Sequence, residues 1–148
     1  MKTVLLLRHA DIDPPGGLAP DDWPLNAAGH SRAEALVHVA GAAGVTALFV
    51  SAARRTQQTA APLASRLGLQ PEQVPPSLPQ LVQRVLSDES GDVVLMVGHS
   101  NTVPQMITAL GAPFAEPLVH GHDDLFVVTV VELGTASVVR LKYGSQAP

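Results

Sequence analysis

Three short apolar runs place the strongest constraint on the fold of this chain. They cover residues 3–7, 46–51 and 92–97. Apolar runs this short are typical of strands that a sheet buries on both faces. Stretches with helical spacing follow each run, over residues 27–43, 54–67 and 102–110. Strands that alternate with helices in this way predict an α/β domain with a mostly parallel sheet.

The remaining segments complete this arrangement. Gly44 and Gly68 are expected to close the first two helices, because glycine is common after a helix end. Residues 11–24 are rich in Pro, Gly and Asp, which indicates a long loop. Residues 71–79 contain four prolines and are expected to be mostly loop, before a short helix over residues 81–86. Two β-rich runs, 125–131 and 136–141, flank Gly134 and predict a hairpin.

The predicted fold is therefore a three-layer α/β sandwich. Its mostly parallel central sheet is flanked by helices and carries a C-terminal antiparallel hairpin. The length of 148 residues predicts a single domain over residues 1–148.

Composition limits the function classes. The net charge of −4 gives no basic surface for nucleic acid. The chain has no cysteine, which excludes disulfides, thiolate metal ligands and cysteine nucleophiles. The N-terminal apolar run is too short for a signal peptide or a membrane span, so we expect a cytoplasmic protein without a membrane partner.

Three polar segments follow the three predicted strands. They are Arg8-His9, residues 51–55 and Gly98-His99-Ser100. Ligands of open parallel sheets bind beyond the carboxyl ends of the strands, so these segments are expected to share one pocket. The pocket would hold two histidines and up to three arginines, with little acid nearby.

This set of side chains fits a phosphate group. A guanidinium binds two phosphate oxygens at once, and a neutral imidazole is a usable nucleophile near pH 7. A second, protonated histidine can stabilise charge on a transferring phosphoryl group. Ser100 or Asn101 is expected to cap the following helix, whose free amides would also favour an anion.

The same segments resemble the motif blocks of the histidine phosphatase superfamily, also called phosphoglycerate-mutase-like. The family's Arg-His-Gly stands here as Arg8-His9-Ala10, and its Ser-x-x-x-Arg-Thr-x-x-Thr-Ala covers residues 51–60. Its Gly-His-Ser is found at residues 98–100, and residues 24–33 look like a further family segment. The whole pattern is most similar to the short bacterial members, such as the phosphohistidine phosphatases.

The resemblance implies a role for each matching residue. His9 would attack phosphorus and form a phosphohistidine, which water then hydrolyses. Arg8 and Arg55 would bind the phosphoryl oxygens, and His99 would stabilise the transferring group. The backbone N–H of Ser100 would also bind substrate. The resemblance implies no metal and no organic cofactor, because the arginines supply the positive charge. The substrate would be a small phosphorylated molecule or a phosphoprotein.

Two departures from the family pattern bear on this interpretation. Ala10 replaces the family glycine, which matters only if the position needs a positive φ. The general acid that many members carry after the second helix is missing. Asp11, Asp13 and His122 are the candidates that the sequence offers, and a good leaving group would need none of them.

The same residues allow three alternative interpretations, which differ in how well the sequence supports them. The pocket could bind a phosphorylated ligand without turnover. Ser100 lies in a near match to the Gly-x-Ser-x-Gly elbow of serine esterases, but Thr102 replaces the last glycine and no histidine follows Asp124. The His-x-His pattern of residues 120–122 is found in zinc hydrolases, but it lacks their further histidine, so we expect no metal site.

Overall fold

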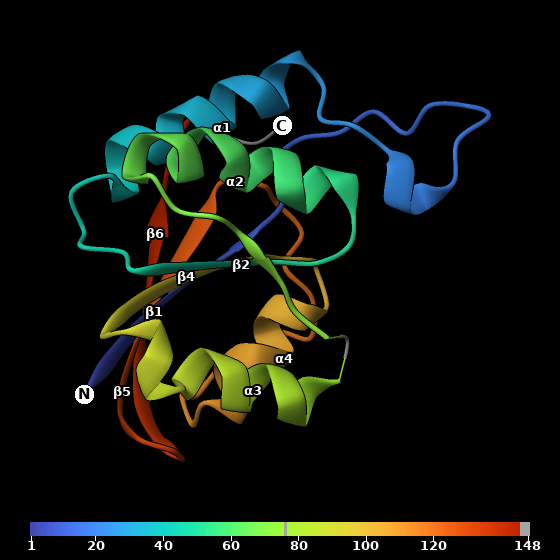
Figure 1. Cartoon of the computed structure of the whole chain (residues 1–148). Coiled ribbons are helices and arrows are strands. Elements are labelled where there is room, and N and C mark those ends of the chain that lie inside the picture. Colours follow the sequence, from blue (N-terminus) through green and yellow to red (C-terminus); the bar gives the residue numbers. More distant parts are fainter. Residues whose placement is uncertain (76, 146–148) are drawn as a thin grey trace.

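A six-stranded sheet with two helices on each face organises the computed structural model of the chain, which describes residues 1–75 and 77–145 (Figure 1). The strand order is β3-β2-β4-β1-β5-β6. The strands are β1 (Lys2–Arg8), β2 (Ala47–Val50), β3 (Glu72–Gln73), β4 (Val93–Gly98), β5 (Asp124–Glu132) and β6 (Thr135–Lys142). The helices are α1 (Ala27–Ala40), α2 (Arg54–Leu67), α3 (Leu78–Leu86) and α4 (Thr102–Ala109), with short 3₁₀ turns η1 (Pro20–Asp22) and η2 (Asp88–Ser90).

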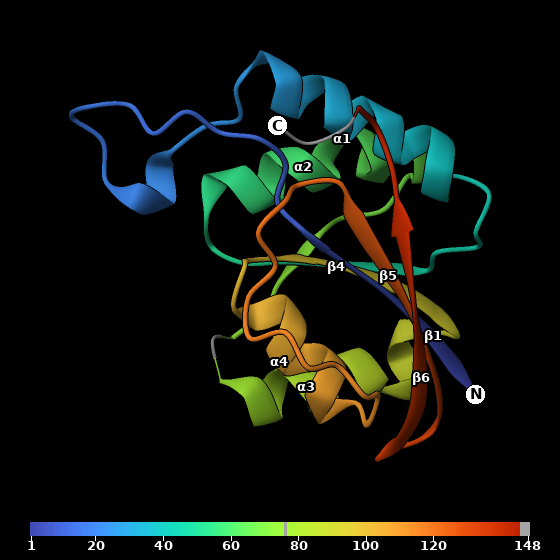
Figure 2. The same cartoon turned by 180° about the vertical axis from the view of Figure 1, so that it is seen from behind.

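The apolar runs form the centre of the sheet, as predicted. In β1, Val4 and Leu6 pack into the core beneath α3 and α4, whereas Leu5 and Leu7 pack into the core beneath α1 and α2. Figures 1 and 2 show these two helix pairs on opposite faces of the sheet. A strand covered on both faces needs apolar side chains at every position, which explains the absence of polar alternation.

The direction of the strands confirms the predicted fold class. Strands β1, β2, β3 and β4 run parallel, and β5 and β6 form the expected antiparallel hairpin at one edge. Strand β5 pairs with β1 in the antiparallel direction. The carboxyl ends of β1, β2 and β4 therefore meet at one edge of the sheet, where the candidate residues follow them.

The end of α1 differs from the sequence prediction, whereas the end of α2 agrees with it. Helix α1 ends at Ala40 rather than residue 43, because the chain turns over the next residues and Gly44 adopts a φ of 81°. Gly68 closes α2 as predicted, with a φ of 68°.

Residues 71–79 are more regular than the predicted loop. Strand β3 pairs with β2, and α3 begins at Leu78 with Pro79 in its first turn. A proline is tolerated there because the first helical N–H groups have no partner within the helix. A two-residue strand has no periodic sequence signal, and residue 76 of this prediction lies outside the described residues.

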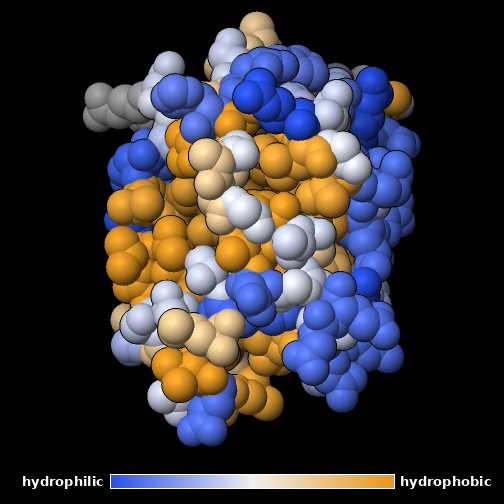
Figure 3. All heavy atoms as spheres, turned by 60° about the vertical axis from the view of Figure 1, so that its left-hand side comes forward, coloured by the Kyte–Doolittle hydropathy of each residue, from blue (hydrophilic) through white to orange (hydrophobic). Residues whose placement is uncertain are grey.

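The surface carries apolar areas as well as charged ones (Figure 3). Large apolar side chains are exposed on the C-terminal hairpin at Val131, Leu133, Val139 and Leu141. Strand β6 is an edge strand, which leaves part of it uncovered. Within the described residues, no helix is long and apolar enough to cross a membrane.

Candidate active site

The four residues predicted to be catalytic lie together at the carboxyl edge of the sheet. Arg8 is the last residue of β1, and His9 follows it. Arg55 lies in the first turn of α2, and His99 follows β4. The imidazole centroids of His9 and His99 are 5.5 Å apart, and Arg55 Nη2 lies 3.3 Å from His99 Nδ1.

One hydrogen bond fixes the tautomer of His9. Its Nδ1 lies 2.8 Å from the carbonyl oxygen of Ala10. A carbonyl oxygen only accepts, so Nδ1 carries the proton and donates it, and the lone pair of a neutral ring is on Nε2. Burial lowers the pKa of His9 to about 3; the bond to Ala10 opposes this shift, and the charges of Arg8 and Arg55 add to it. His9 is therefore a neutral imidazole with Nε2 available as a nucleophile.

The alanine in place of the family glycine is compatible with this geometry. Within the described residues, only glycines have a positive φ, so Ala10 is not strained. Its N–H donates to Thr59 Oγ1 at 2.9 Å. Thr59 in turn donates to the carbonyl oxygen of Arg55 at 2.7 Å, which ties the His9 segment to the first turns of α2.

Two guanidinium groups flank the histidines. Arg8 Nη1 donates to the carbonyl oxygen of His120 at 2.7 Å, and Arg55 Nη1 donates to that of Pro20 at 2.6 Å. Arg8 Nε is buried and has no partner within the described residues. Burial and then the positive charge of Arg55 lower the pKa of Arg8. An anion between the two arginines would relieve this repulsion.

His99 is held from both sides of its ring. Arg55 can only donate, so Nδ1 of His99 accepts, and Nε2 donates to Ser51 Oγ at 2.9 Å. Ser51 Oγ also contacts Thr56 Oγ1 at 2.9 Å. Burial and then Arg55 lower the pKa of His99, so the protonated form expected from the sequence is disfavoured in this arrangement. Ser51 had no predicted role, although it is the first residue of the second motif block.

The structure confirms one of the two predicted N-cap positions of α4 but not a side-chain cap. Asn101 is the N-cap residue, but its side chain makes no cap hydrogen bond. Instead, Thr102 Oγ1 accepts from the backbone N–H of His99 at 2.8 Å, which orients the loop that carries this histidine. Ser100 lies between His99 and α4, and its carbonyl oxygen accepts from Val119 N–H at 2.9 Å. The substrate contact of Ser100 stays a prediction.

The candidate general acids lie in different surroundings. Asp11 is buried and pairs with Arg32, whose Nε lies 2.6 Å from Asp11 Oδ1. Burial would raise the pKa of Asp11, but the hydrogen bond and charge of Arg32 outweigh it and lower that pKa, so Asp11 is ionised. Asp13 is exposed. Only His122 of the three touches His9, with ring centroids 5.4 Å apart.

The His-x-His segment has no metal-site geometry in the described part of the chain. No group of three or more histidine, aspartate or glutamate side chains there is placed to hold a metal ion. Asp124, which follows this segment, instead accepts from Arg140 at 2.8 Å and pairs with Lys142 at 2.7 Å.

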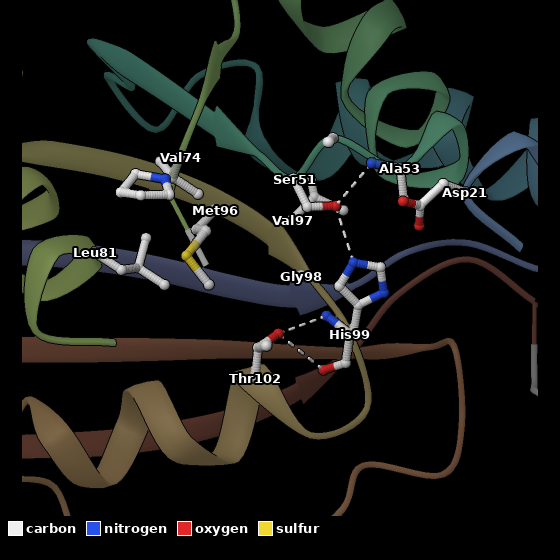
Figure 4. Close-up of a pocket in the computed structure, with 12 residues that line it drawn as sticks. Asp21, Ser51, Ala53, Val74, Leu81, Met96, Val97, Gly98, His99 and Thr102 are labelled. Carbon is white, nitrogen blue, oxygen red and sulfur yellow. Dashed lines mark hydrogen bonds between the residues drawn. The ribbon is translucent and has the colours of Figure 1, made fainter. Parts of the chain in front are cut away.

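A cavity of about 370 Å³ adjoins His99 (Figure 4). Its polar lining includes Asp21, Ser51 and Thr102. Val74, Leu81 and Met96 form its apolar wall, on the side away from His99. A cleft with an apolar wall and a few polar groups is the usual form of a small-molecule site.

Comparison with known families gives a match over the first half of the chain. Residues 4–76 match the family model described as histidine phosphatase superfamily, branch 1. This range includes the motif blocks around His9 and Arg55. No curated protein matches the chain.

Solved structures share the fold over nearly the whole chain. The protein histidine phosphatase SixA complexed with tungstate is 19% identical, with a TM-score of 0.80, covering 95% of this chain and 96% of that one. Bacillus stearothermophilus YhfR is 17% identical, with a TM-score of 0.70, covering 92% and 94%. A mycobacterial glucosyl-3-phosphoglycerate phosphatase with inorganic phosphate is 15% identical, with a TM-score of 0.69, covering 98% of each chain. The predicted resemblance is confirmed, and with it the enzyme class, a histidine-dependent phosphatase.

Proposed function

We propose that this chain, which belongs to the histidine phosphatase superfamily, hydrolyses a phosphomonoester or phosphoramidate through a phosphohistidine on His9. One observation carries the proposal. The hydrogen bond from His9 Nδ1 to the Ala10 carbonyl oxygen leaves Nε2 as the free nitrogen of a buried, neutral ring on which the charges of Arg8 and Arg55 act.

In the first step, the Nε2 lone pair of His9 attacks phosphorus and the bond to the leaving group breaks. Arg8 and Arg55 bind the phosphoryl oxygens, whose charge stabilises both guanidinium groups. Arg55 then donates to phosphate instead of to His99 Nδ1. The freed nitrogen can bind a proton, so phosphate binding favours the protonated form of His99. The Ser51 hydroxyl holds that ring in place through the change.

In the second step, water attacks phosphorus and the N–P bond breaks. The electron pair returns to His9 Nε2, and inorganic phosphate leaves.

The leaving group of the first step occupies the cavity beside His99, whose apolar wall suits a substrate with a compact apolar portion. A small phosphorylated molecule or a phosphorylated side chain of a partner protein fits this description.

Rapid alkaline quench with an activated phosphomonoester labelled in its phosphoryl group tests the proposal. The variant His9→Asn places an amide nitrogen where Nδ1 was, which preserves the bond to Ala10 and removes Nε2. The exposed His38 of α1 provides the matched control His38→Asn. We expect an alkali-stable, acid-labile phosphoenzyme in wild type and His38→Asn, and none in His9→Asn.

Other outcomes distinguish the alternatives. Phosphate binding without turnover or phosphoenzyme, in folded protein, would indicate a binding module. Hydrolysis of a carboxylic ester that is lost in Ser100→Ala but kept in His9→Asn would indicate the esterase. Turnover of the phosphomonoester by His9→Asn at the wild-type rate would refute the role of His9.

A further inference from the structure

A third imidazole, His122, packs against the nucleophile and has no role in the steps above. Its ring centroid lies 5.4 Å from that of His9, at an interplanar angle of 48°. It comes from the loop before β5, 113 residues away in the chain. The His9 ring is therefore flanked by His99 on one side and by His122 on another.

The tautomer of His122 is fixed by the backbone of His9. His122 Nδ1 lies 2.8 Å from the carbonyl oxygen of His9 and must donate to it. A neutral His122 therefore keeps its lone pair on Nε2, which that bond leaves unused. The ring is half-buried, so a water molecule can reach it.

The charged and titratable groups that face His122 are Arg8, Asp11, Arg32 and His9. Burial lowers the pKa of His122, and the charges of Arg8 and Arg32 act in the same direction. The hydrogen bond to His9 and the charge of Asp11 oppose the shift. The balance favours the neutral ring, which is the form that accepts a proton.

We propose that His122 is the general base that activates water in the second step. The inference rests on the proposed function, because it requires a phosphohistidine on His9. As the water oxygen bonds to phosphorus, one water proton moves to His122 Nε2. The N–P bond breaks, its electron pair returns to His9 Nε2, and inorganic phosphate forms. His122 then releases the proton to solvent, which restores both rings.

The arrangement of the rings supports this assignment. A base acts within hydrogen-bond distance of the proton it removes, or through one water. A phosphoryl group on His9 Nε2 extends from the edge of the His9 ring, and of the three candidates His122 is the one whose ring contacts that ring, with centroids 5.4 Å apart. Asp11 is already paired with Arg32 and Asp13 is exposed, so neither offers a comparable contact.

The variant His122→Asn separates proton transfer from positioning. Its amide nitrogen takes the place of Nδ1 and retains the bond to the carbonyl oxygen of His9, but the variant has no Nε2. The control is His38→Asn, the same substitution at an exposed position of α1. The probe is p-nitrophenyl phosphate, whose leaving group needs no acid.

Stopped-flow release of nitrophenol and a rapid alkaline quench follow the two steps separately. We expect the first-turnover burst of His122→Asn to stay within about 3-fold of the control. Its steady-state turnover should fall by about 10²- to 10⁴-fold, the usual contribution of a general base, while phosphoenzyme accumulates toward one per chain. The rate of phosphoenzyme hydrolysis should fall at acidic pH in the control, and this dependence should be absent in His122→Asn.

The experiment also separates a failure of the His122 assignment from a failure of the His9 mechanism. Equal steady-state turnover in His122→Asn and the control would overturn the inference and leave the role of His9 intact. Loss of the burst in a variant that still unfolds cooperatively would also overturn it, because His122 would then act before the phosphoenzyme exists. The absence of phosphoenzyme from wild type and His122→Asn alike would refute the proposed function itself.

Discussion

Replacing Arg32 with methionine should lower the stability of the protein, because the buried carboxylate of Asp11 loses its partner. Arg32 and Asp11 are 4% and 6% exposed, and their ion pair is 2.6 Å long. Arg32 Nη1 also donates to the carbonyl oxygens of Tyr143 and Ser145, at 2.9 and 2.8 Å. Arg32 thus joins α1 to the loop after β1 and to the segment after β6.

Removal of one partner of a buried pair leaves the other charge unpaired, which typically costs about 3–5 kcal/mol. We expect Arg32→Met to lower the free energy of unfolding by this amount. For a chain of this size, the loss corresponds to a decrease in Tm of about 6–20 °C. The control Arg66→Met changes an exposed arginine of α2 and should alter stability by less than about 0.5 kcal/mol.

Urea unfolding between pH 4 and pH 7 tests the origin of this cost. The wild-type pKa of Asp11 is lowered, so its stabilising contribution is present above the unfolded value, about 3.9, and is lost as pH falls through the folded pKa. Without Arg32, burial raises that pKa, and protonation at acidic pH relieves the unpaired charge. The stability gap between Arg32→Met and wild type should therefore narrow as pH falls.

A loss below about 1 kcal/mol at pH 7 would show that the carboxylate of Asp11 is not left as an unpaired buried charge. A larger loss that does not change between pH 4 and pH 7 would show that the cost comes from packing rather than from the charge of Asp11. Asp11→Asn that retains phosphatase activity would be consistent with a structural role for Asp11, and loss of activity in a stable Asp11→Asn protein would contradict it.

Ser51→Ala removes the acceptor of His99 Nε2, and we expect kcat/KM to fall by about 10-fold in steady-state assays while Tm changes little; an unchanged kcat/KM would exclude the positioning role. Arg55→Lys replaces a forked donor by a point charge and should lower kcat/KM by about 10²-fold, whereas a loss below 3-fold would indicate that charge alone suffices. Burial lowers the pKa of His9 to about 3, so below about pH 6.5 the unfolded chain binds a proton that the folded chain does not. As the pH decreases, this group should therefore lower the free energy of unfolding by up to about 1.4 kcal/mol per pH unit. Urea titrations at pH 5 and 6 would measure this slope, and His9→Asn should reduce it.

Much of the fold could be predicted from the sequence because its signals are local. No polar side chain interrupts β2, β4 or residues 4–7 of β1, and the sequence predicts α2 with the bounds Arg54–Leu67 that the structure shows. Strand β3 could not be predicted, because Glu72 and Gln73 form a strand only through pairing with β2. The sequence places the end of α1 at Gly44 instead of Gly41, because several small residues in this segment permit a turn.

Those residues of the candidate site that lie in a recognisable sequence motif could be predicted. Arg8, His9, Arg55 and His99 belong to motif blocks that follow predicted strands, and the structure brings them together. The tertiary partners were not predictable in this way.

Partners that meet only in the folded chain carry no local signal. Ser51 meets His99 across 48 residues of sequence, and Asp11 meets Arg32 across 21. In the sequence alone, Asp11, Asp13 and His122 are therefore equivalent candidates for proton transfer, whereas their surroundings in the folded chain distinguish them.

The role of His9 as the nucleophile can be tested by the position of phosphate on the trapped phosphoenzyme. Because Nδ1 of His9 donates to the carbonyl oxygen of Ala10, we expect phosphate to be attached only to Nε2. Peptide mapping at alkaline pH identifies the residue, and ³¹P NMR distinguishes the two ring nitrogens. Phosphate on Nε2 of His9 would support nucleophilic attack by this nitrogen, whereas phosphate on Nδ1, on His99 or on Ser100 would rule it out.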